Sequence, residues 1–309
     1  MMFKKTLIYI GGPTASGKTD LGIQLAKNFN TEIISCDSRQ FYKEMTIGTS
    51  VPSIYERKSI THHFIQHKSV VENYNAWDFA KDANSLLKKL FKDKEQVIMI
   101  GGSGLYAKSV LNGLDYFPKI PLSVRNEIEN IFLQNGIDSL KNMLSKADPI
   151  YYKKVDKSNH RRLIRALEVF KASGKPYSSF LNKTTKKKSF NVKTIIIDIP
   201  KEILHERIKS RIKIMLNHGL EKEARKLYQY KDNIAMQTIG YKEWFDFFDK
   251  KISKEQVENE IVKNTNRYAK KQLTWFKKNF KYNFINEIKV QSIINDLSTS
   301  EKFKYSLNN

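Results

Sequence analysis

Short apolar runs alternate with longer amphipathic segments along the first third of the chain, and the alternation resumes near residue 190. Uninterrupted apolar runs predict buried strands, whereas apolar positions spaced three and four residues apart predict helices. Strands are predicted at residues 7–10, 31–37, 96–104 and 192–200, with helices at residues 20–29 and 76–91. Strands separated by helices favour a parallel sheet with right-handed crossovers. The pattern therefore predicts an α/β fold.

A different pattern, of helices joined by short polar loops, occupies residues 118–188. Pro118 and Pro121 stand at its start, and the lysine run of residues 186–188 stands at its end. Long helices follow the last strand, and in the one at residues 253–280 an apolar stripe indicates core packing. Its members are Val257, Ile261, Tyr268, Trp275 and Phe276. We expect a core from residues 1–117 and 189–309, interrupted by a helical insertion at 118–188.

The octapeptide GPTASGKT at residues 12–19 lies between the first strand and the first helix. It fits the pattern GxxxxGK followed by Ser or Thr. Glycines let successive backbone N–H groups converge on one anion, and the helix N-terminus adds partial positive charge. Lys18 adds a full charge, and the Thr19 hydroxyl can ligate Mg²⁺. The sequence therefore predicts a P-loop NTPase-like core that binds a di- or triphosphate.

The chain is strongly basic, with 55 Lys and Arg against 32 Asp and Glu, a net charge of +23. Such an excess indicates a polyanionic partner such as a nucleic acid, although a solvated lysine-rich surface is an alternative. No apolar run reaches the length of about 20 residues that a membrane helix requires, so no membrane association is expected. The single cysteine, Cys36, excludes an internal disulfide and favours a cytoplasmic protein.

Five of the ten arginines lie in two predicted helical segments. Arg161 and Arg165 share one helix face by i,i+4 spacing, and Arg207 and Arg211 repeat that spacing. The arginine fork matches phosphate oxygens in a way that lysine does not. Ion pairing with nearby glutamates such as Glu168 is the alternative.

An ATP-hydrolysing site with such a loop usually has a strand that ends in an acidic residue. The strand at residues 96–100 ends instead in the glycine turn GGSG, whereas the strand before Asp37 does end on an acid. A phosphate-binding loop without an obvious acid for this role does not point to ATP hydrolysis. Another electrophile that carries a diphosphate is therefore a candidate ligand. A nucleotide or small-molecule kinase and a non-catalytic RNA-binding protein with a vestigial loop stay open as alternatives.

Six blocks of this sequence together resemble the tRNA dimethylallyltransferase family, in the family's order and over most of residues 7–280. The phosphate loop alone is shared by many nucleotide enzymes, but the combination is specific. The blocks are GPTASGKT (12–19), DSRQFYKEMTIGT (37–49), GGSGLY (101–106), NHRRLIRALEVF (159–170), IGYKEW (239–244) and RYAKKQLTWF (267–276).

The resemblance implies transfer of a dimethylallyl group from dimethylallyl diphosphate to the exocyclic amine of the adenosine just 3′ of the anticodon. Asp37 matches the family's general base, although an Asp at this place can simply cap the following turn. Lys18 and Thr19 would act in catalysis, and Thr19 would carry Mg²⁺ as the cofactor. The implied diphosphate site comprises Gly12, Pro13, Thr14, Ala15, Ser16, Gly17, Lys18, Thr19, Arg207 and Arg211.

The same resemblance implies that the helical insertion grips the anticodon stem-loop of tRNA, and that the protein acts as a monomer. An unpaired anticodon loop lowers the cost of moving the target base out of its stack. Asn266 and Lys271 stand where the family often has arginine, so the specific phosphate contacts of those arginines are not carried over to this chain. The implied tRNA-contacting residues are Asp37, Ser38, Arg39, Gln40, Ser103, Arg125, Arg161, Arg162, Leu163, Ile164 and Arg165.

Overall fold

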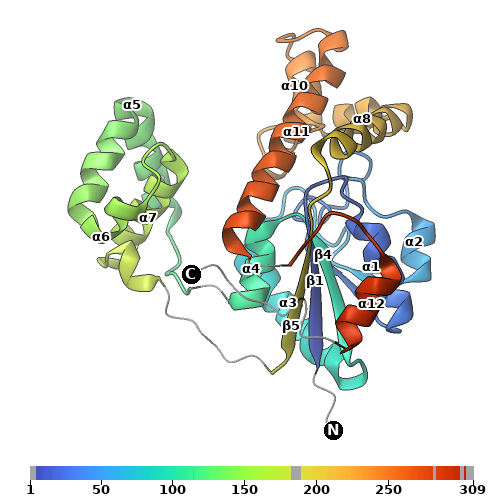
Figure 1. The fold of residues 1–309 in the computed structure, drawn as a ribbon. Coiled ribbons are helices and arrows are strands. Elements are labelled where there is room, and N and C mark those ends of the chain that lie inside the picture. The colour runs from blue at the N-terminus through green and yellow to red at the C-terminus, as the bar shows by residue number, and fades with distance from the viewer. Residues whose placement is uncertain (1–4, 114, 182–188, 281–282, 300–302, 304–309) are drawn as a thin grey trace. The chain divides into compact units, whose positions relative to one another are not determined.

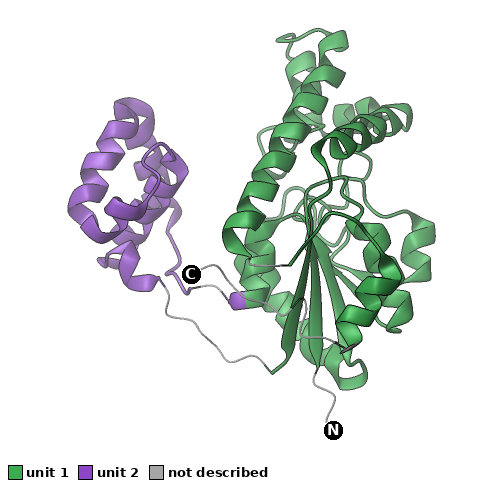
Figure 2. Cartoon of the chain, in the orientation of Figure 1, with its two compact units in different colours: residues 1–111, 188–309 green, residues 112–187 purple. Residues whose placement is uncertain are grey.

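The computed structural model describes residues 5–113, 115–181, 189–280, 283–299 and 303. The chain forms two compact units, residues 1–111 with 188–309 and residues 112–187 (Figure 2). The second unit begins six residues before the insertion predicted at 118–188. The predicted far boundary, with its lysine run, lies outside the described residues.

A six-stranded sheet forms the centre of the first unit, and every neighbouring pair of its strands is parallel. The strand order is β3-β2-β4-β1-β5-β6, so β1 lies in the middle with β4 and β5 on its two sides. The strands are β1 (Thr6–Gly11), β2 (Ile33–Ser35), β3 (His62–His63), β4 (Gln96–Gly101), β5 (Asn191–Ile197) and β6 (Phe284–Ile285).

Helices cover both faces of this sheet (Figure 1), which explains why its central strands are apolar without alternation. In β1, Ile8 and Ile10 pack into one core, while Leu7 and Tyr9 pack into the other. Each central strand contributes to both cores, because successive side chains of a strand point to opposite faces of the sheet.

The first core contains side chains from α1 (Lys18–Asn28), α8 (Lys201–Asn217), α9 (Leu220–Leu227), α10 (Lys242–Phe248), α11 (Lys254–Asn279) and α12 (Val290–Thr299). The second contains side chains from α3 (Ala76–Asp93) and α4 (Gly104–Asn112), together with Phe276 from the last turn of α11 and Phe280 just after that helix. Local signals set the helix starts: Asn75 caps α3, and Ser53 caps α2 (Ile54–Ser59).

The second unit is a small helical body with its own apolar core. Its helices are α5 (Leu122–Ala147), α6 (Pro149–Lys154) and α7 (His160–Ser173), and α5 is broken at Gly136, where φ is 70°. Buried Asp148 caps α6 by accepting a hydrogen bond from Tyr151 N and also accepts one from Ser178 N. The core residues are Ile128, Leu140, Leu144, Val155, Leu163, Ala166 and Leu167.

The structure confirms the predicted parallel sheet and its four predicted strands, although β2 is only three residues long. Two short edge strands, β3 and β6, were not predicted, because two residues are too few for a periodic signal. The described part of the chain contains no helix with the length and apolar character needed to cross a membrane.

Candidate active site

The site lies at the carboxyl edge of three neighbouring strands. β2, β4 and β1 are adjacent in the sheet, so the segments that follow them emerge side by side. These segments carry Asp37 after β2, Ser103 after β4 and the phosphate loop after β1. Open parallel sheets generally bind ligands at this edge.

The phosphate loop has the backbone conformation that its glycines permit. Gly12 and Gly17 have φ values of 150° and 93°, and Ala15 also has a positive φ of 61°. A β-carbon at Gly12 would lie 2.9 Å from the carbonyl oxygen of Ile197, so no larger residue fits there. The loop leads directly into α1, whose first residue is Lys18.

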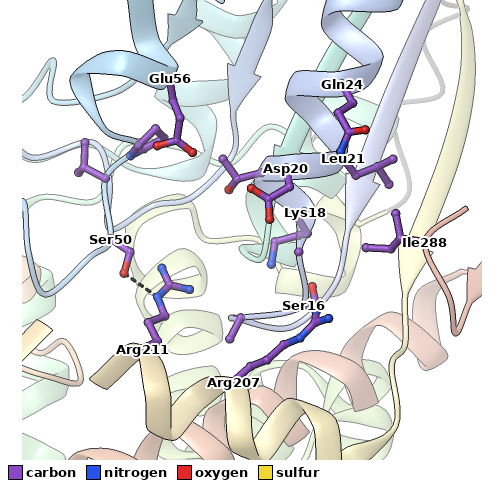
Figure 3. Close-up of a pocket in the computed structure, with 15 residues that line it drawn as sticks. Ser16, Lys18, Asp20, Leu21, Gln24, Ser50, Glu56, Arg207, Arg211 and Ile288 are labelled. Carbon is purple, nitrogen blue, oxygen red and sulfur yellow. Dashed lines mark hydrogen bonds between the residues drawn. The ribbon is translucent and has the colours of Figure 1, made fainter. Parts of the chain in front are cut away.

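A pocket of about 530 Å³ lies beside this loop (Figure 3). It is lined by the loop and α1, by the segment that follows the Asp37 turn, and by two arginines of α8. The lining residues are Ala15, Ser16, Gly17, Lys18, Thr19, Asp20, Leu21, Gln24, Ser50, Val51, Pro52, Glu56, Arg207, Arg211 and Ile288. The buried hydroxyl of Ser16 has no hydrogen-bond partner within the described part of the chain.

Both predicted arginines of α8 face this pocket (Figure 3). Arg211 is held on two sides: Nε donates to Ser50 Oγ at 2.6 Å, and Nη1 donates to Thr14 Oγ1 at 3.2 Å. Arg207 is exposed on the same helix, one turn earlier. Two guanidinium groups thus border the loop on the side of α8.

Lys18 is partly desolvated in this pocket. Its Nζ donates to the Pro13 carbonyl oxygen at 2.5 Å. Burial lowers the pKa of Lys18 to about 8, against a smaller opposing effect of Asp37, while Arg211 adds to the lowering. Burial likewise lowers the pKa of Arg211, and Asp37 again opposes the effect. Two cations and one carboxylate therefore interact electrostatically beside the phosphate loop.

Asp37 closes a tight turn after β2. Its Oδ1 accepts a hydrogen bond from Arg39 N at 3.0 Å, and its carbonyl accepts one from Gln40 N. Ser103 of the glycine turn completes the arrangement, because its Oγ accepts from Ser38 N at 3.0 Å and lies 3.1 Å from Ser38 Oγ. The turn-capping role considered for Asp37 is therefore present, through one carboxylate oxygen.

The next two residues of this turn are engaged with other parts of the first unit. Arg39 Nη1 donates to the carbonyl oxygens of Ile234 and Ala235, and Gln40 Nε2 donates to those of Thr49 and Ser50. In this conformation Gln40 positions the backbone around Ser50. A contact between Gln40 and a substrate base stays a prediction.

Gln272 on α11 is a site residue that the sequence analysis missed. Its Oε1 accepts from Thr14 N at 3.0 Å, and its Nε2 donates to Gly102 O at 3.0 Å. The buried amide thus joins the phosphate loop to the glycine turn after β4. A β-carbon at Gly102 would lie 2.3 Å from Gln272 Nε2, which explains a glycine at this place in GGSG.

Tyr268, one helical turn before Gln272, departs from the predicted core stripe of α11. The stripe is buried at Val257, Ile261 and Phe276, but Tyr268 is 40% exposed. Loss of hydration raises the pKa of Tyr268 to about 12, and Asp37 contributes to the same shift. Tyr268 is therefore a neutral residue in the electrostatic environment of Asp37.

The predicted RNA-contacting residues of the helical unit differ in pairing and in burial. Arg125 and Arg165 both form ion pairs with the buried carboxylate of Glu168, with N–O distances of 3.4 and 3.2 Å. The side chain of Leu163 is buried in the core of the unit. This burial argues against a side-chain contact with RNA at Leu163.

The other three members of that set differ in exposure. Arg161 and Arg162 are exposed at the start of α7, whereas Ile164 is half-buried and packs against the core of the unit. The two exposed arginines are available to a ligand without disturbing an ion pair found in the described part of the chain.

Few protein ligands are available for a metal. Thr19 and Asp20 lie on the first turn of α1 in the pocket, but the described residues contain no group of three or more His, Cys, Asp and Glu that could hold an ion. Mg²⁺ typically keeps several waters and binds through one or two protein oxygens plus substrate phosphates. The residues present fit an ion of that kind, held chiefly by a bound diphosphate.

Comparison with known proteins gives the same family throughout. The sequence model of the family described as IPP transferase matches residues 40–279. A protein of Christiangramia forsetii named tRNA dimethylallyltransferase is 50% identical, covering 88% of this chain and 90% of its own length. A protein of the same name from Flavobacterium psychrophilum is 49% identical, with 88% and 91% covered.

Solved structures agree with the sequence relatives. The full-length tRNA isopentenylpyrophosphate transferase of Bacillus halodurans is 33% identical, with a TM-score of 0.70 and 96% of each chain covered. A eukaryotic dimethylallyltransferase described as acting on tRNA is 29% identical, with a TM-score of 0.77, over 89% of this chain and 70% of that one.

Proposed function

The chain belongs to the IPP transferase family, and we propose that it moves a dimethylallyl group from dimethylallyl diphosphate to tRNA. The acceptor is the exocyclic amine of the adenosine on the 3′ side of the anticodon, and diphosphate is released. The observation that carries the proposal is the pocket beside the phosphate loop, where Lys18, Arg207 and Arg211 converge. The adjacent strand β4 ends in glycine and supplies no acid for a hydrolytic reaction.

In the proposed reaction the amine nitrogen bonds to the primary carbon of the dimethylallyl group while the carbon–oxygen bond to diphosphate breaks. Negative charge grows on the departing diphosphate, and the loop N–H groups, Lys18 and Arg211 stabilise it. The hydroxyl of Ser16, which has no partner among the described residues, is a further donor for a phosphate oxygen. A Mg²⁺ ion held by Thr19 and the diphosphate would neutralise part of the same charge.

Asp37 is the proposed acceptor of the amine proton. An adenine amine is a weak nucleophile because its lone pair is delocalised into the ring, so removal of the proton assists attack. Arg39 N occupies Asp37 Oδ1 and thereby orients the carboxylate. The second carboxylate oxygen is the one that takes the proton. One residue thus closes the turn and acts as the base.

The helical unit is the proposed grip on the anticodon stem-loop. Arg161 and Arg162 are exposed, and the Arg125 and Arg165 side chains are oriented by Glu168. Contacts of this kind to phosphate fix the position of the RNA and give salt-dependent affinity. Ser38, Arg39 and Ser103 would border the extruded base. The buried thiol of Cys36, which forms no disulfide, accords with action in the cytoplasm, and we expect a monomer.

Mass spectrometry of unmodified tRNA incubated with the protein, Mg²⁺ and dimethylallyl diphosphate tests the function. One added dimethylallyl group on the adenosine beside the anticodon, formed without ATP, is the expected result. ADP formation in a control with ATP alone would indicate a kinase instead. Salt-dependent tRNA binding without any product would indicate a non-catalytic RNA-binding protein.

Two variants assign the roles within the site. Asp37→Asn keeps the acceptor for Arg39 N but cannot take a proton at physiological pH, so single-turnover transfer should fall by about 10²-fold or more. Glu206→Gln, on the exposed side of α8, is the matched control, because it also removes one carboxylate. Wild-type single-turnover rates in Asp37→Asn would remove the base assignment.

A further inference from the structure

Glu223 on α9 makes an unusual set of contacts with the segment that follows the Asp37 turn. Its Oε2 accepts from the backbone N–H groups of Thr46 and Ile47, and its Oε1 accepts from those of Ile47 and Gly48. These distances run from 2.9 to 3.1 Å. One carboxylate therefore holds three consecutive backbone N–H groups.

Tyr241, at the start of α10, supplies a further donor to the Glu223 carboxylate. Its hydroxyl donates to Glu223 Oε1 at 2.7 Å, and its ring is fully buried against Gly48. A β-carbon at Gly48 would lie 2.5 Å from the ring, so the glycine permits the close approach. Burial first, and the Glu223 carboxylate second, raise the pKa of Tyr241, which keeps the hydroxyl protonated as a donor.

The segment that Glu223 holds, residues 46–48, continues to Ser50, which is in an unfavourable backbone conformation. Ser50 has a φ of 47°, in the left-handed region that few residues other than glycine adopt. Such strain persists only where the surroundings over-determine it, and it often marks functional positions. Ser50 N donates to Ile47 O at 3.0 Å, so the held segment is continuous with the strained residue.

Ser50 connects the two halves of the site. Its Oγ accepts from Arg211 Nε at 2.6 Å, on the diphosphate side. Its carbonyl accepts from Gln40 Nε2 at 2.9 Å, on the side of the Asp37 turn. A displacement of Ser50 would therefore remove one of the two hydrogen bonds that hold the Arg211 guanidinium and one that supports the turn carrying Asp37.

We propose that Glu223 is a positioning residue for prenyl transfer, which fixes residues 46–50 so that Ser50 aims Arg211 at the departing diphosphate. Glu223 itself is not among the residues that line the pocket. The inference rests on the proposed function, since it assigns to Arg211 the diphosphate of the prenyl donor. It adds a residue whose effect on the reaction is transmitted through a hydrogen-bonded loop.

Glu223→Gln tests this inference because the amide nitrogen cannot accept from the backbone donors that now share Oε2. Misplacement of a catalytic group by about 1 Å can cost on the order of 10²-fold in rate. We expect kcat/KM for dimethylallyl diphosphate to fall by about 10- to 100-fold, with weaker inhibition by inorganic diphosphate. Affinity for tRNA should fall by less than kcat/KM does, because the held segment is bonded to the predicted RNA-contacting turn through Gln40, whereas it bonds directly to Arg211.

A double-mutant cycle with Ser50→Ala separates positioning from general stability. If Glu223 acts through Ser50, adding Glu223→Gln to Ser50→Ala should cause little further loss of kcat/KM. Glu221→Gln is the matched control on the same helix, since Glu221 pairs with Arg225 and Lys254 at the surface. The kcat/KM of Glu221→Gln for dimethylallyl diphosphate should match that of the wild type within about 2-fold.

The outcomes separate the inference from the proposed function. Wild-type protein that transfers no prenyl group would refute the function. An active wild type with an unaffected, folded Glu223→Gln variant would refute only the inference, as would losses that multiply in the double mutant. If Glu223→Gln does not fold, Tyr241→Phe replaces it, because it removes the hydrogen bond from the Tyr241 hydroxyl to Glu223. The inference then requires that the losses of Tyr241→Phe and Ser50→Ala are also non-additive.

Discussion

Replacement of Gln272 by methionine is the sharpest test of how the site is assembled. Methionine has a similar length and suits a helix, but its sulfur is only a weak acceptor for Thr14 N and it has no donor for Gly102 O. Two backbone groups at the carboxyl edge of the sheet would then lose their partners. The substitution therefore tests one bridge between α11, the phosphate loop and the glycine turn.

The expected magnitude follows from these two hydrogen bonds. A buried polar group left without a partner costs about 1–3 kcal/mol. The Gly102 carbonyl is buried in its contact with Gln272, whereas the contact at Thr14 is only partly buried. We therefore expect Gln272→Met to lower the free energy of unfolding by about 3 kcal/mol, with full cost at Gly102 and a reduced cost at Thr14.

Urea unfolding and steady-state kinetics measure the two consequences. The urea midpoint should fall, and kcat/KM for dimethylallyl diphosphate should fall by about 10-fold or more because the phosphate loop loses its support. Lys271→Met is the control, since it places the same side chain at the exposed neighbouring position. A Gln272→Met variant with the midpoint and kcat/KM of Lys271→Met would refute the reasoning.

Three further outcomes are expected. Because the pKa of Lys18 is about 8, kcat/KM for dimethylallyl diphosphate should fall as the pH rises through 8 and neutral Lys18 stops attracting the anion; a profile flat well above pH 8 would contradict this. Gly104→Ala would place a β-carbon 2.3 Å from the Trp275 ring and should destabilise the fold by about 1–3 kcal/mol, a loss that Trp275→Phe should partly relieve in melting experiments. Burial lowers the pKa of His67 from 6.5 to about 4, so the unfolded state binds its proton first and stability should decline as the pH falls from 6.5 towards 4. His67→Phe should reduce that decline in urea unfolding measured at both pH values, and an unchanged decline would assign the acid sensitivity to other groups.

Local chemistry made the main elements and the phosphate loop predictable from sequence. The strand, glycine turn and helix around Lys18 are consecutive, and each depends on residues only a few positions apart. Apolar runs identified the central strands because burial on both faces leaves them no polar positions. The i,i+4 spacing of Arg207 and Arg211 placed both on one side of α8, and both line the pocket.

The sequence also determined the family, because six motifs in a fixed order are far more specific than any one of them. The family model and the relatives at up to 50% identity confirm that prediction. The roles assigned to single residues stay predictions, and in the helical unit the burial of Leu163 argues against one of them.

The partners of the site residues were decided only by the tertiary structure. Gln272 contacts a loop residue 258 positions earlier in the chain, and Glu223 holds backbone groups 175 to 177 positions earlier. Periodicity reports which face of a helix is buried, so it assigned Tyr268 to the core stripe, although 40% of its surface is exposed. Packing of α9, α10 and α11 against the sheet brings these side chains to the carboxyl edge, because hydrogen-bond partners depend on proximity in space and not on spacing along the chain.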